Sequence, residues 1–417
     1  MEERKVFFKQ KLNTYNSKVN IVNGIFAIVA INLVNPYFSK FALRLGASDY
    51  QIGLLSSLPA LFSVLTLIMG AVIIEGSTNK KKTTSLIMFS HKAFYLLLAV
   101  VPFMPENYQS WVFVILVGIM NLPGSISITG FQSSIGDIFD ERARGRAMGL
   151  RNRYSAIFGM IVAFTSGRLL TIIPNNNSET IILYQVFFII AFIFAQGEVL
   201  SYLKFRGIRK VKQEKNAGYL KSLKVVLKNL PKQRKFIIFT CCSLLFHFGW
   251  QMGWPLFSLY TIDYLNADET WLGIISVASS LSSILTYTLW GKLADKYGNS
   301  IMLGISTFGM AITPILYAAS NSLIALVLFN VIIGVSVAGT VLILFNILLE
   351  VIPSQNRTIY IAIYNTLINL SATISPIIGV RLKKDFNIYL ALIIVGILRL
   401  IGSASFFLRN KFIKKAK

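Results

Sequence analysis

Four polar and aromatic side chains recur at helical spacing within one apolar stretch of the chain. They stand at positions i, i+3, i+4 and i+7, and so share one helix face: His247, Trp250, Gln251 and Trp254. Against lipid, such a face would be costly. Against a cavity, it would offer ring surfaces and hydrogen bonds to a solute. Packing between helices is the alternative use, and we favour the cavity.

Amide side chains are scattered through three further apolar stretches. They are Asn32, Asn35, Gln132, Asn330 and Asn346. Amides inside apolar helices more often bond to a neighbouring helix than to a ligand, yet each can also bond to a solute. We expect some of them to line the same cavity. Pro36 follows Asn35 and should loosen the outer end of its helix.

Ionisable side chains inside the apolar stretches are few, namely Lys92, Arg168, Glu198, His247 and Arg399. Each is a functional candidate because a charge in hydrocarbon is costly. Glu198 is the carboxylate that could bind a coupling proton, although a structural ion pair is the favoured use. No acid in the sequence is the evident partner of Arg399, which we expect to bond to carbonyls of a neighbouring helix.

No set of residues with catalytic or metal-binding spacing is present. His91 and His247 lie far apart, and Cys241 and Cys242 are adjacent within an apolar run. No glycine-rich phosphate loop occurs, so ATP is not expected to drive the protein. We therefore expect no enzyme activity, no metal and no cofactor.

The elements that carry these residues are membrane spans. Of the 417 residues, 54% are hydrophobic and 14% charged, against roughly 25% charged in soluble domains. Apolar runs of about 20 residues recur, long enough to cross ~30 Å of hydrocarbon. We predict an all-α polytopic membrane protein with twelve spans, at 20–43, 50–74, 84–103, 110–137, 148–172, 181–203, 236–262, 271–291, 300–319, 322–348, 358–380 and 387–408.

Basic residues account for the formal net charge of +24. Most of them lie in the N-terminal segment, in alternate loops and in the C-terminal tail, as the positive-inside rule requires. We therefore place both termini in the cytoplasm and expect no nucleic-acid partner. The polar segment 1–20 is followed by no cleavage site, so it is not a signal peptide.

The chain repeats itself. Residues 45–56 align with residues 265–276, an offset of 220. Further on, Asp137 matches Glu350 and Arg144 matches Arg357, both at an offset of 213. Two blocks in one order predict two parallel six-helix units, 1–203 and 236–417, in separate bundles. Between them, residues 204–235 carry twelve basic residues and one acid. Apolar residues at helical spacing there predict an amphipathic helix on the cytoplasmic leaflet, which Pro231 should end.

A short charged turn joins the eighth and ninth predicted spans. Residues 291–300 read Gly-Lys-Leu-Ala-Asp-Lys-Tyr-Gly-Asn-Ser, in which Gly291 and Gly298 permit close approach and a sharp turn. The stretch resembles the signature Gly-x-x-x-Asp-(Arg/Lys)-x-Gly of the major facilitator superfamily of secondary transporters. In the first half, the corresponding stretch keeps Gly70 but has Ile74 where the acid belongs.

The resemblance implies two bundles that rock around a central cavity lined by the first, fourth, seventh and tenth spans. In that family, the acid of the signature meets the cytoplasmic N-terminus of a helix in the opposite bundle. Here this would be Asp295 with the fifth span, near Arg151 and Arg153. We therefore expect gating by Asp295, Gly291, Gly298, Arg151 and Arg153. Proton coupling is a family-level expectation, with Glu198 as the candidate site.

The sequence thus predicts a transporter that carries a small organic solute through the inner or plasma membrane by alternating access, as a monomer. We lean to efflux of drugs or metabolites by proton antiport. A symporter for sugar or nucleoside uptake is the close alternative, and a membrane sensor without transport is a more distant one.

Overall fold

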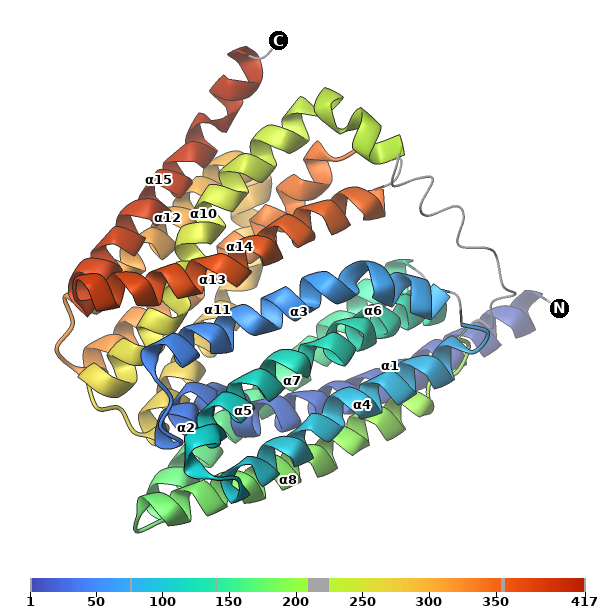
Figure 1. Ribbon diagram of the computed structural model, residues 1–417. Helices are drawn as coiled ribbons and strands as arrows, with labels where there is room; N and C mark the ends of the chain where they lie inside the picture. Colours follow the sequence, from blue (N-terminus) through green and yellow to red (C-terminus); the bar gives the residue numbers. More distant parts are fainter. Residues whose placement is uncertain (1, 76, 140, 209–224, 354–356, 416–417) are drawn as a thin grey trace. The chain divides into compact units, whose positions relative to one another are not determined.

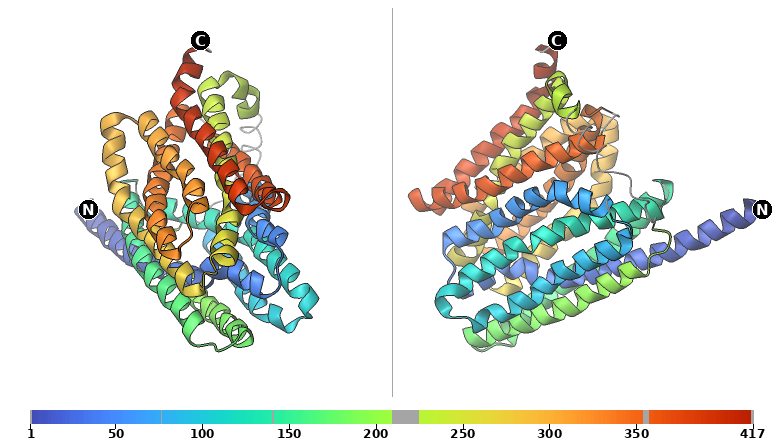
Figure 2. Two further views of the ribbon diagram at one scale, coloured as in Figure 1. Left: turned by 90° about the vertical axis from the view of Figure 1, so that its left-hand side faces the viewer. Right: turned by 45° about the vertical axis from the view of Figure 1, so that its right-hand side comes forward.

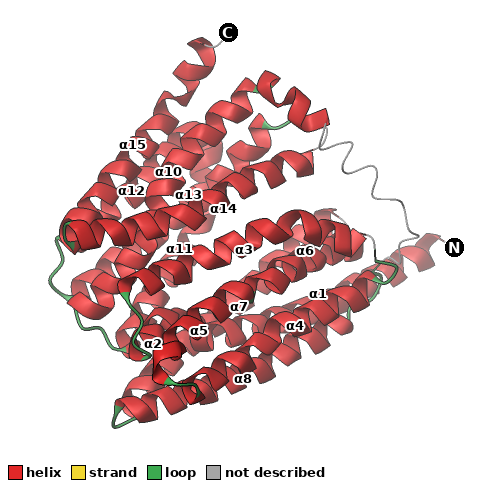
Figure 3. Cartoon of the chain, viewed as in Figure 1, coloured by secondary structure: helices red, strands yellow, loops and turns green. Residues whose placement is uncertain are grey.

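A computed structural model describes residues 2–75, 77–139, 141–208, 225–353 and 357–415. Within these ranges, nearly every residue is helical and no strand occurs (Figure 3). The first half forms α1 (Glu2–Val34), α2 (Phe38–Arg44), α3 (Asp49–Glu75), α4 (Lys80–Val100), α5 (Glu106–Ile119), α6 (Asn121–Ile138), α7 (Glu141–Ile172) and α8 (Asn177–Leu203). The second half forms α10 (Arg234–Leu259), α11 (Glu269–Tyr297), α12 (Asn299–Ala318), α13 (Leu323–Val351), α14 (Arg357–Asp385) and α15 (Ile388–Lys415).

Length and composition make these helices membrane spans. Eleven described segments are long and apolar enough to cross a bilayer, and α3, with 27 residues, supplies the predicted second span. α8 shows why: its buried side carries Tyr184, Phe188 and Ala191, while Ile189 and Ile193 on its other side are exposed. A helix that is apolar all round needs an apolar solvent on its exposed side. The predicted all-α polytopic fold is confirmed.

The chain divides into two compact units. One comprises Met1–Gly46 and Phe62–Asn216, and the other comprises Ala47–Leu61 and Ala217–Lys417. The division therefore falls inside the segment 204–235 that we predicted as a linker. The first part of α3 groups with the second unit, whereas the sequence repeat assigned all of α3 to the first. Most of the predicted amphipathic helix lies outside the described residues.

In the first unit, α1 packs against α7 and α8, and α4 packs against α6 and α8 (Figure 1, Figure 2). Asparagines on one face of α1 bond it to α7, to α8 and to the residues just after α8. Asn16 donates to the carbonyl of Arg206, Asn20 to that of Ala147, and Asn23 to that of Glu198 at 2.8 Å. Buried amides with partners fix how helices meet, because an unpaired amide in an apolar interior is costly.

In the second unit, α10 packs against α14 and α15, α11 against α13, and α12 against α13 and α15. Its core is aromatic where α10 meets α15: Phe239 and Phe246 both contact Phe406. Such tilted ring pairs stabilise a contact beyond the area that they bury. Pro255 lies inside α10, and a π-helical turn, Tyr260–Tyr264, continues that helix.

The repeat seen in the sequence is visible in the helix ends. α3 begins at Asp49 and α11 at Glu269, which are aligned positions of the two repeats. At the next aligned pair, Asp137 and Glu350, each half ties the first residue of one helix to the end of another. In the first half, Nζ of Lys80 lies 3.9 Å from Oδ2 of Asp137. In the second half, Nδ2 of Asn299 donates to Oε1 of Glu350 at 2.5 Å.

Helix boundaries depart from our predictions at several places, three of which follow. α1 begins at Glu2, so the polar segment before the first span is helical too. A 3-10 turn, Asn35–Tyr37, contains Pro36 and interrupts the first span near its predicted loose end. The fourth span, predicted as one helix, breaks at Met120. Pro123, three residues later, has no N–H to donate to the preceding turn, which explains the break.

Candidate functional site

A cavity with a mostly apolar lining lies within the first unit, among α1, α4, α6, α7 and α8. Its volume is about 400 Å³. Apolar walls meet charged side chains there, as Ile28, Met88, Phe131, Lys92, Arg151 and Glu198. Cavities that bind small organic molecules have this mixture of apolar surface and a few placed polar groups, at volumes of roughly 300–1,000 Å³.

Two of the charges form a buried ion pair. Lys92 on α4 places its Nζ 2.9 Å from Oε2 of Glu198 on α8, and the two side chains are only 6% and 10% exposed. Charges this deep persist only when they are paired, because removal from water costs several kcal/mol per ion. The structural ion pair that we favoured for Glu198 is present, and proton coupling at Glu198 stays a prediction.

Arg151 on α7 brings a second positive charge to the cavity. Its Nη2 donates to Oδ1 of Asn23 at 3.2 Å, and its guanidinium lies 4.7 Å from the ring centre of Phe131. Its Nε is buried without a hydrogen-bond partner. Gly24 makes room for this side chain, since a Cβ there would stand 2.6 Å from Cγ of Arg151. A larger residue at that position would push Arg151 aside.

Neutral polar groups complete the cavity wall. Gln132 on α6 lines it, as we predicted for a substrate-facing residue, and so does Asn152 on α7. His91 lies against Gly124, where an added Cβ would stand 3.1 Å from its Nε2, and its Nδ1 has no partner. Asn32, also predicted for the cavity, instead lies against Gly159 of α7.

The predicted face of the seventh span is divided between burial and exposure. His247 is buried and its Nδ1 lies 2.8 Å from the carbonyl of Ser243, while Gln251 donates to the carbonyl of Ile368 at 3.1 Å. Trp250 contacts Phe246, and Trp254 is 38% exposed. The two polar members of this face therefore bond to helix carbonyls, and the two tryptophans keep accessible ring surface.

The remaining predicted amides take different positions. Asn35 is exposed in the 3-10 turn, and Asn346 is half-buried on α13. Asn330 is buried and donates to the hydroxyl of Tyr317 and to the carbonyl of Leu326, both at 2.8 Å. Its amide thus bonds within α13 and to α12, the use that is commoner for amides in membrane helices.

Arg399 on α15 bonds to carbonyls, as we expected from the sequence. It donates to the carbonyls of Gly249 at 3.1 Å, Met310 at 3.1 Å and Trp250 at 2.9 Å. It is 1% exposed, so this guanidinium ties α15 to α10 and α12 deep within the second unit. Arg168, the other arginine predicted inside a span, is exposed on α7.

The signature turn is tight. α11 ends at Tyr297 and α12 begins at Asn299, with Gly298 between them at φ +86°, where other residues would be strained. Gly298 thus has the turning role predicted for it. Gly291 lies within α11, and an added Cβ there would meet no atom within 4 Å. The side chains of Asp295 and Arg153 are exposed. Exposure does not test gating, and their gating role stays a prediction.

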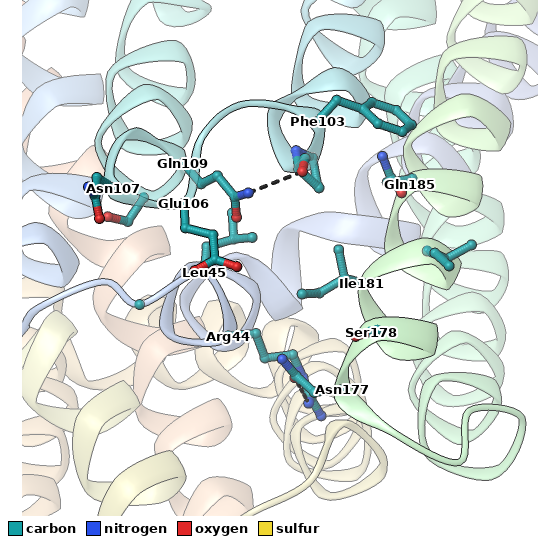
Figure 4. A pocket seen from close by; sticks show the side chains of 14 residues that line it. Arg44, Leu45, Phe103, Glu106, Asn107, Gln109, Asn177, Ser178, Ile181 and Gln185 are labelled. Carbon is teal, nitrogen blue, oxygen red and sulfur yellow. Dashed lines mark hydrogen bonds between the residues drawn. The ribbon is translucent and has the colours of Figure 1, made fainter.

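A second pocket in the first unit, of about 740 Å³, lies where α2 ends and where α5 and α8 begin (Figure 4). Arg44 donates to Oδ1 of Asn177 at 2.7 Å, and Gln109 donates to the carbonyl of Met104 at 2.8 Å. These bonds hold the connections between helices. In Figure 4, Arg44 and Asn177 lie side by side at one edge of the pocket.

Among the described residues, eleven apolar spans together with α3 fall into two repeated sets, and with the charges held inside them they define a polytopic membrane transporter. The chain belongs to the Major Facilitator Superfamily, whose family model matches residues 21–246 and 239–417. The signature at residues 291–300 and the repeat agree with this membership.

The chain is similar to several named transporters and resistance proteins. The chain is 26% identical over 328 residues to the MFS-type transporter SLC18B1 of Rattus norvegicus, covering 76% of this chain and 67% of that protein. It is 28% identical over 132 residues to the tetracycline resistance protein, class H, of Pasteurella multocida, covering 32% of each. It is 29% identical over 111 residues to the multidrug resistance protein MdtG of Proteus mirabilis, covering 26% of this chain and 27% of that protein.

Solved structures show the same fold. The D-xylose-proton symporter matches with a TM-score of 0.73 at 12% identity, covering 96% of this chain and 97% of that one. The nucleoside transporter NupG matches with a TM-score of 0.72 at 14% identity, covering 94% of this chain and 99% of that one. The family model thus confirms the predicted family, and the solved structures confirm the predicted fold.

Proposed function

We propose that this protein is a secondary active transporter that exports a small organic solute across the cell membrane by alternating access. The observation that carries the proposal is the cavity of the first unit, in which a buried ion pair and a further arginine meet apolar walls. Charges inside membrane helices are costly and are typically kept for substrate or ion handling.

Export is the direction that the relatives support. Two of the proteins that this chain resembles are named for tetracycline resistance and for multidrug resistance. In the second unit, we propose that the accessible rings of Trp250 and Trp254 also contact the solute. An electrochemical gradient supplies the energy, and Glu198 is the carboxylate that a coupling proton would use.

The cavity can be tested by filling it. Ile28 lines the cavity, and Ile28→Trp should block it. Ile193 on α8 is 61% exposed, so Ile193→Trp makes the same change on the side that we expect to face lipid. The purified proteins are reconstituted into liposomes, and uptake and counterflow of a panel of radiolabelled drugs, sugars, nucleosides and carboxylates are measured with and without imposed gradients.

The wild-type protein and Ile193→Trp should give saturable flux of the same solute, and Ile28→Trp should give none. Equal flux from both variants would show that the solute takes another path. No saturable flux of any solute through the wild-type protein would contradict the transporter assignment. Accumulation on the cytoplasmic side would contradict export and favour uptake of a sugar or nucleoside.

A further inference from the structure

The charges that line the cavity of the first unit do not balance. Among the described residues that line it, Lys92 and Arg151 are cations, and Glu198 is the one carboxylate. Glu198 forms an ion pair with Lys92, whose Nζ lies 2.9 Å from its Oε2. One positive charge is therefore left over at a half-buried site between apolar helices, where it is less well hydrated than in bulk water.

The surplus charge belongs to Arg151. Within the described part of the chain, no carboxylate oxygen lies within 4.0 Å of its guanidinium, whose bonded partner is the neutral amide of Asn23. Its Nε donor is buried and unpaired. A guanidinium has five donors in a planar fork, and a carboxylate accepts two of them at once. Arg151 is thus held in place but is not neutralised.

We propose, on the basis of the transport function above, that the solute is an organic monoanion whose carboxylate binds Arg151. Its apolar body lies on the cavity walls, which include Phe131, Ile28 and Met88. A monoanion restores neutrality with one group. A neutral solute would leave Arg151 uncompensated, and a cationic solute would add a further like charge beside it.

The proposal also assigns different tasks to the two cations. Lys92 is 4% exposed and holds Glu198, so it is a structural partner rather than a docking group. Arg151 is only half-buried, and its ring contact with Phe131 orients the guanidinium. An arginine that is oriented and partly accessible binds an anion with little loss of side-chain freedom.

Matched pairs of carboxylate and carboxamide test the charge without changing the skeleton. The pairs are benzoate with benzamide, indole-3-acetate with indole-3-acetamide, and salicylate with salicylamide. Binding to the purified protein in detergent is measured by equilibrium dialysis and by thermal shift. The variants are Arg151→Gln, Arg151→Lys, and Arg146→Gln as a control, since Arg146 is an exposed arginine on the same helix.

At least one carboxylate should bind at least tenfold more tightly than its amide. Arg151→Gln should lose that preference, because a hydrogen bond to a charged group contributes enough for a tenfold change in affinity. Arg151→Lys should keep part of the preference, and Arg146→Gln all of it. The melting temperatures of the unliganded variants, read in the same thermal-shift assay, separate a loss of binding from a folding defect.

Three results would overturn the proposal: amides binding as tightly as their carboxylates, wild-type affinity in Arg151→Gln, or no binding of any carboxylate at millimolar concentration. Binding needs no transport, so this test is separate from that of the proposed function. Carboxylate binding without flux would contradict export and leave the anion site standing. Saturable flux of neutral solutes alone would contradict the anion site and leave transport standing.

Discussion

Replacing Glu198 by Gln should destabilise the first unit more than replacing Lys92 by Met. The two charges lie 2.9 Å apart with side-chain exposures of 6% and 10%. At an effective dielectric constant of about 20, their attraction is ~6 kcal/mol, most of which offsets the cost of taking both ions out of water. Removing one partner from such a pair typically costs ~3–5 kcal/mol, because the other charge stays buried and unpaired.

The two single variants differ because of Arg151, whose charge acts on both members of the pair. In Lys92→Met, Glu198 still has Arg151 as a nearby cation, so the loss should fall near ~3 kcal/mol or below. In Glu198→Gln, two cations share a cavity with no acid, so the loss should reach the upper end of that range. The double variant Lys92→Met/Glu198→Gln removes both charges and should be less destabilised than Glu198→Gln alone.

The measurement is reversible unfolding in mixed micelles of mild detergent and SDS, as a double-mutant cycle. The cycle isolates the interaction from the separate effects of each substitution. If the losses in unfolding free energy of the two single variants simply add, the coupling free energy is below about 0.5 kcal/mol. The two charges would then not stabilise each other, and this reasoning would be refuted. Equal losses in the two single variants would show that Arg151 does not compensate Glu198.

Three further predictions concern transport. Asp295→Asn should open the cytoplasmic side, because the carboxylate is expected to bind a helix N-terminus when that side is closed. Cysteine accessibility at the cytoplasmic ends of the fifth and eighth spans should rise, and unchanged accessibility with lost transport would remove the gating role. Trp250→Ala and Gln251→Ala should each raise the half-saturation concentration while the protein stays folded, and two unchanged values would make this face packing alone. If Glu198 carries a coupled proton, Lys92→Met/Glu198→Gln should lose its response to an imposed pH gradient and keep counterflow exchange. A normal response would exclude Glu198 from coupling.

The sequence predicted what depends on local pattern. Apolar runs predicted the spans, and Gly298 predicted the turn that ends α11 at φ +86°. Arg399 was correctly expected to bond to carbonyls, because no acid in the sequence was an evident partner. The spans follow from the length of the apolar runs, and the turn follows from the backbone conformation that glycine allows. The bonds of Arg399 follow from the lack of an acid that could pair with it.

What the sequence did not predict depends on contacts between distant helices. Lys92 and Glu198 were both recognised as ionisable residues inside spans, yet no spacing rule joins a residue of α4 to one of α8. Asn23 was missed, although it bonds to Ser201 and Arg151. Its signal was present in the spacing of Asn16, Asn20 and Asn23, which places three amides on one helix face.

The surplus charge of Arg151 has an electrical consequence. With a bound monoanion the cavity is neutral, and without it the cavity carries one positive charge. A membrane potential acts only on charge that changes its place in the field, by up to ~2.3 kcal/mol per charge at 100 mV. Voltage would then act on the return of the empty carrier rather than on the loaded one. An inside-negative potential would draw the empty cavity towards the cytoplasm, the side from which an exported solute must bind.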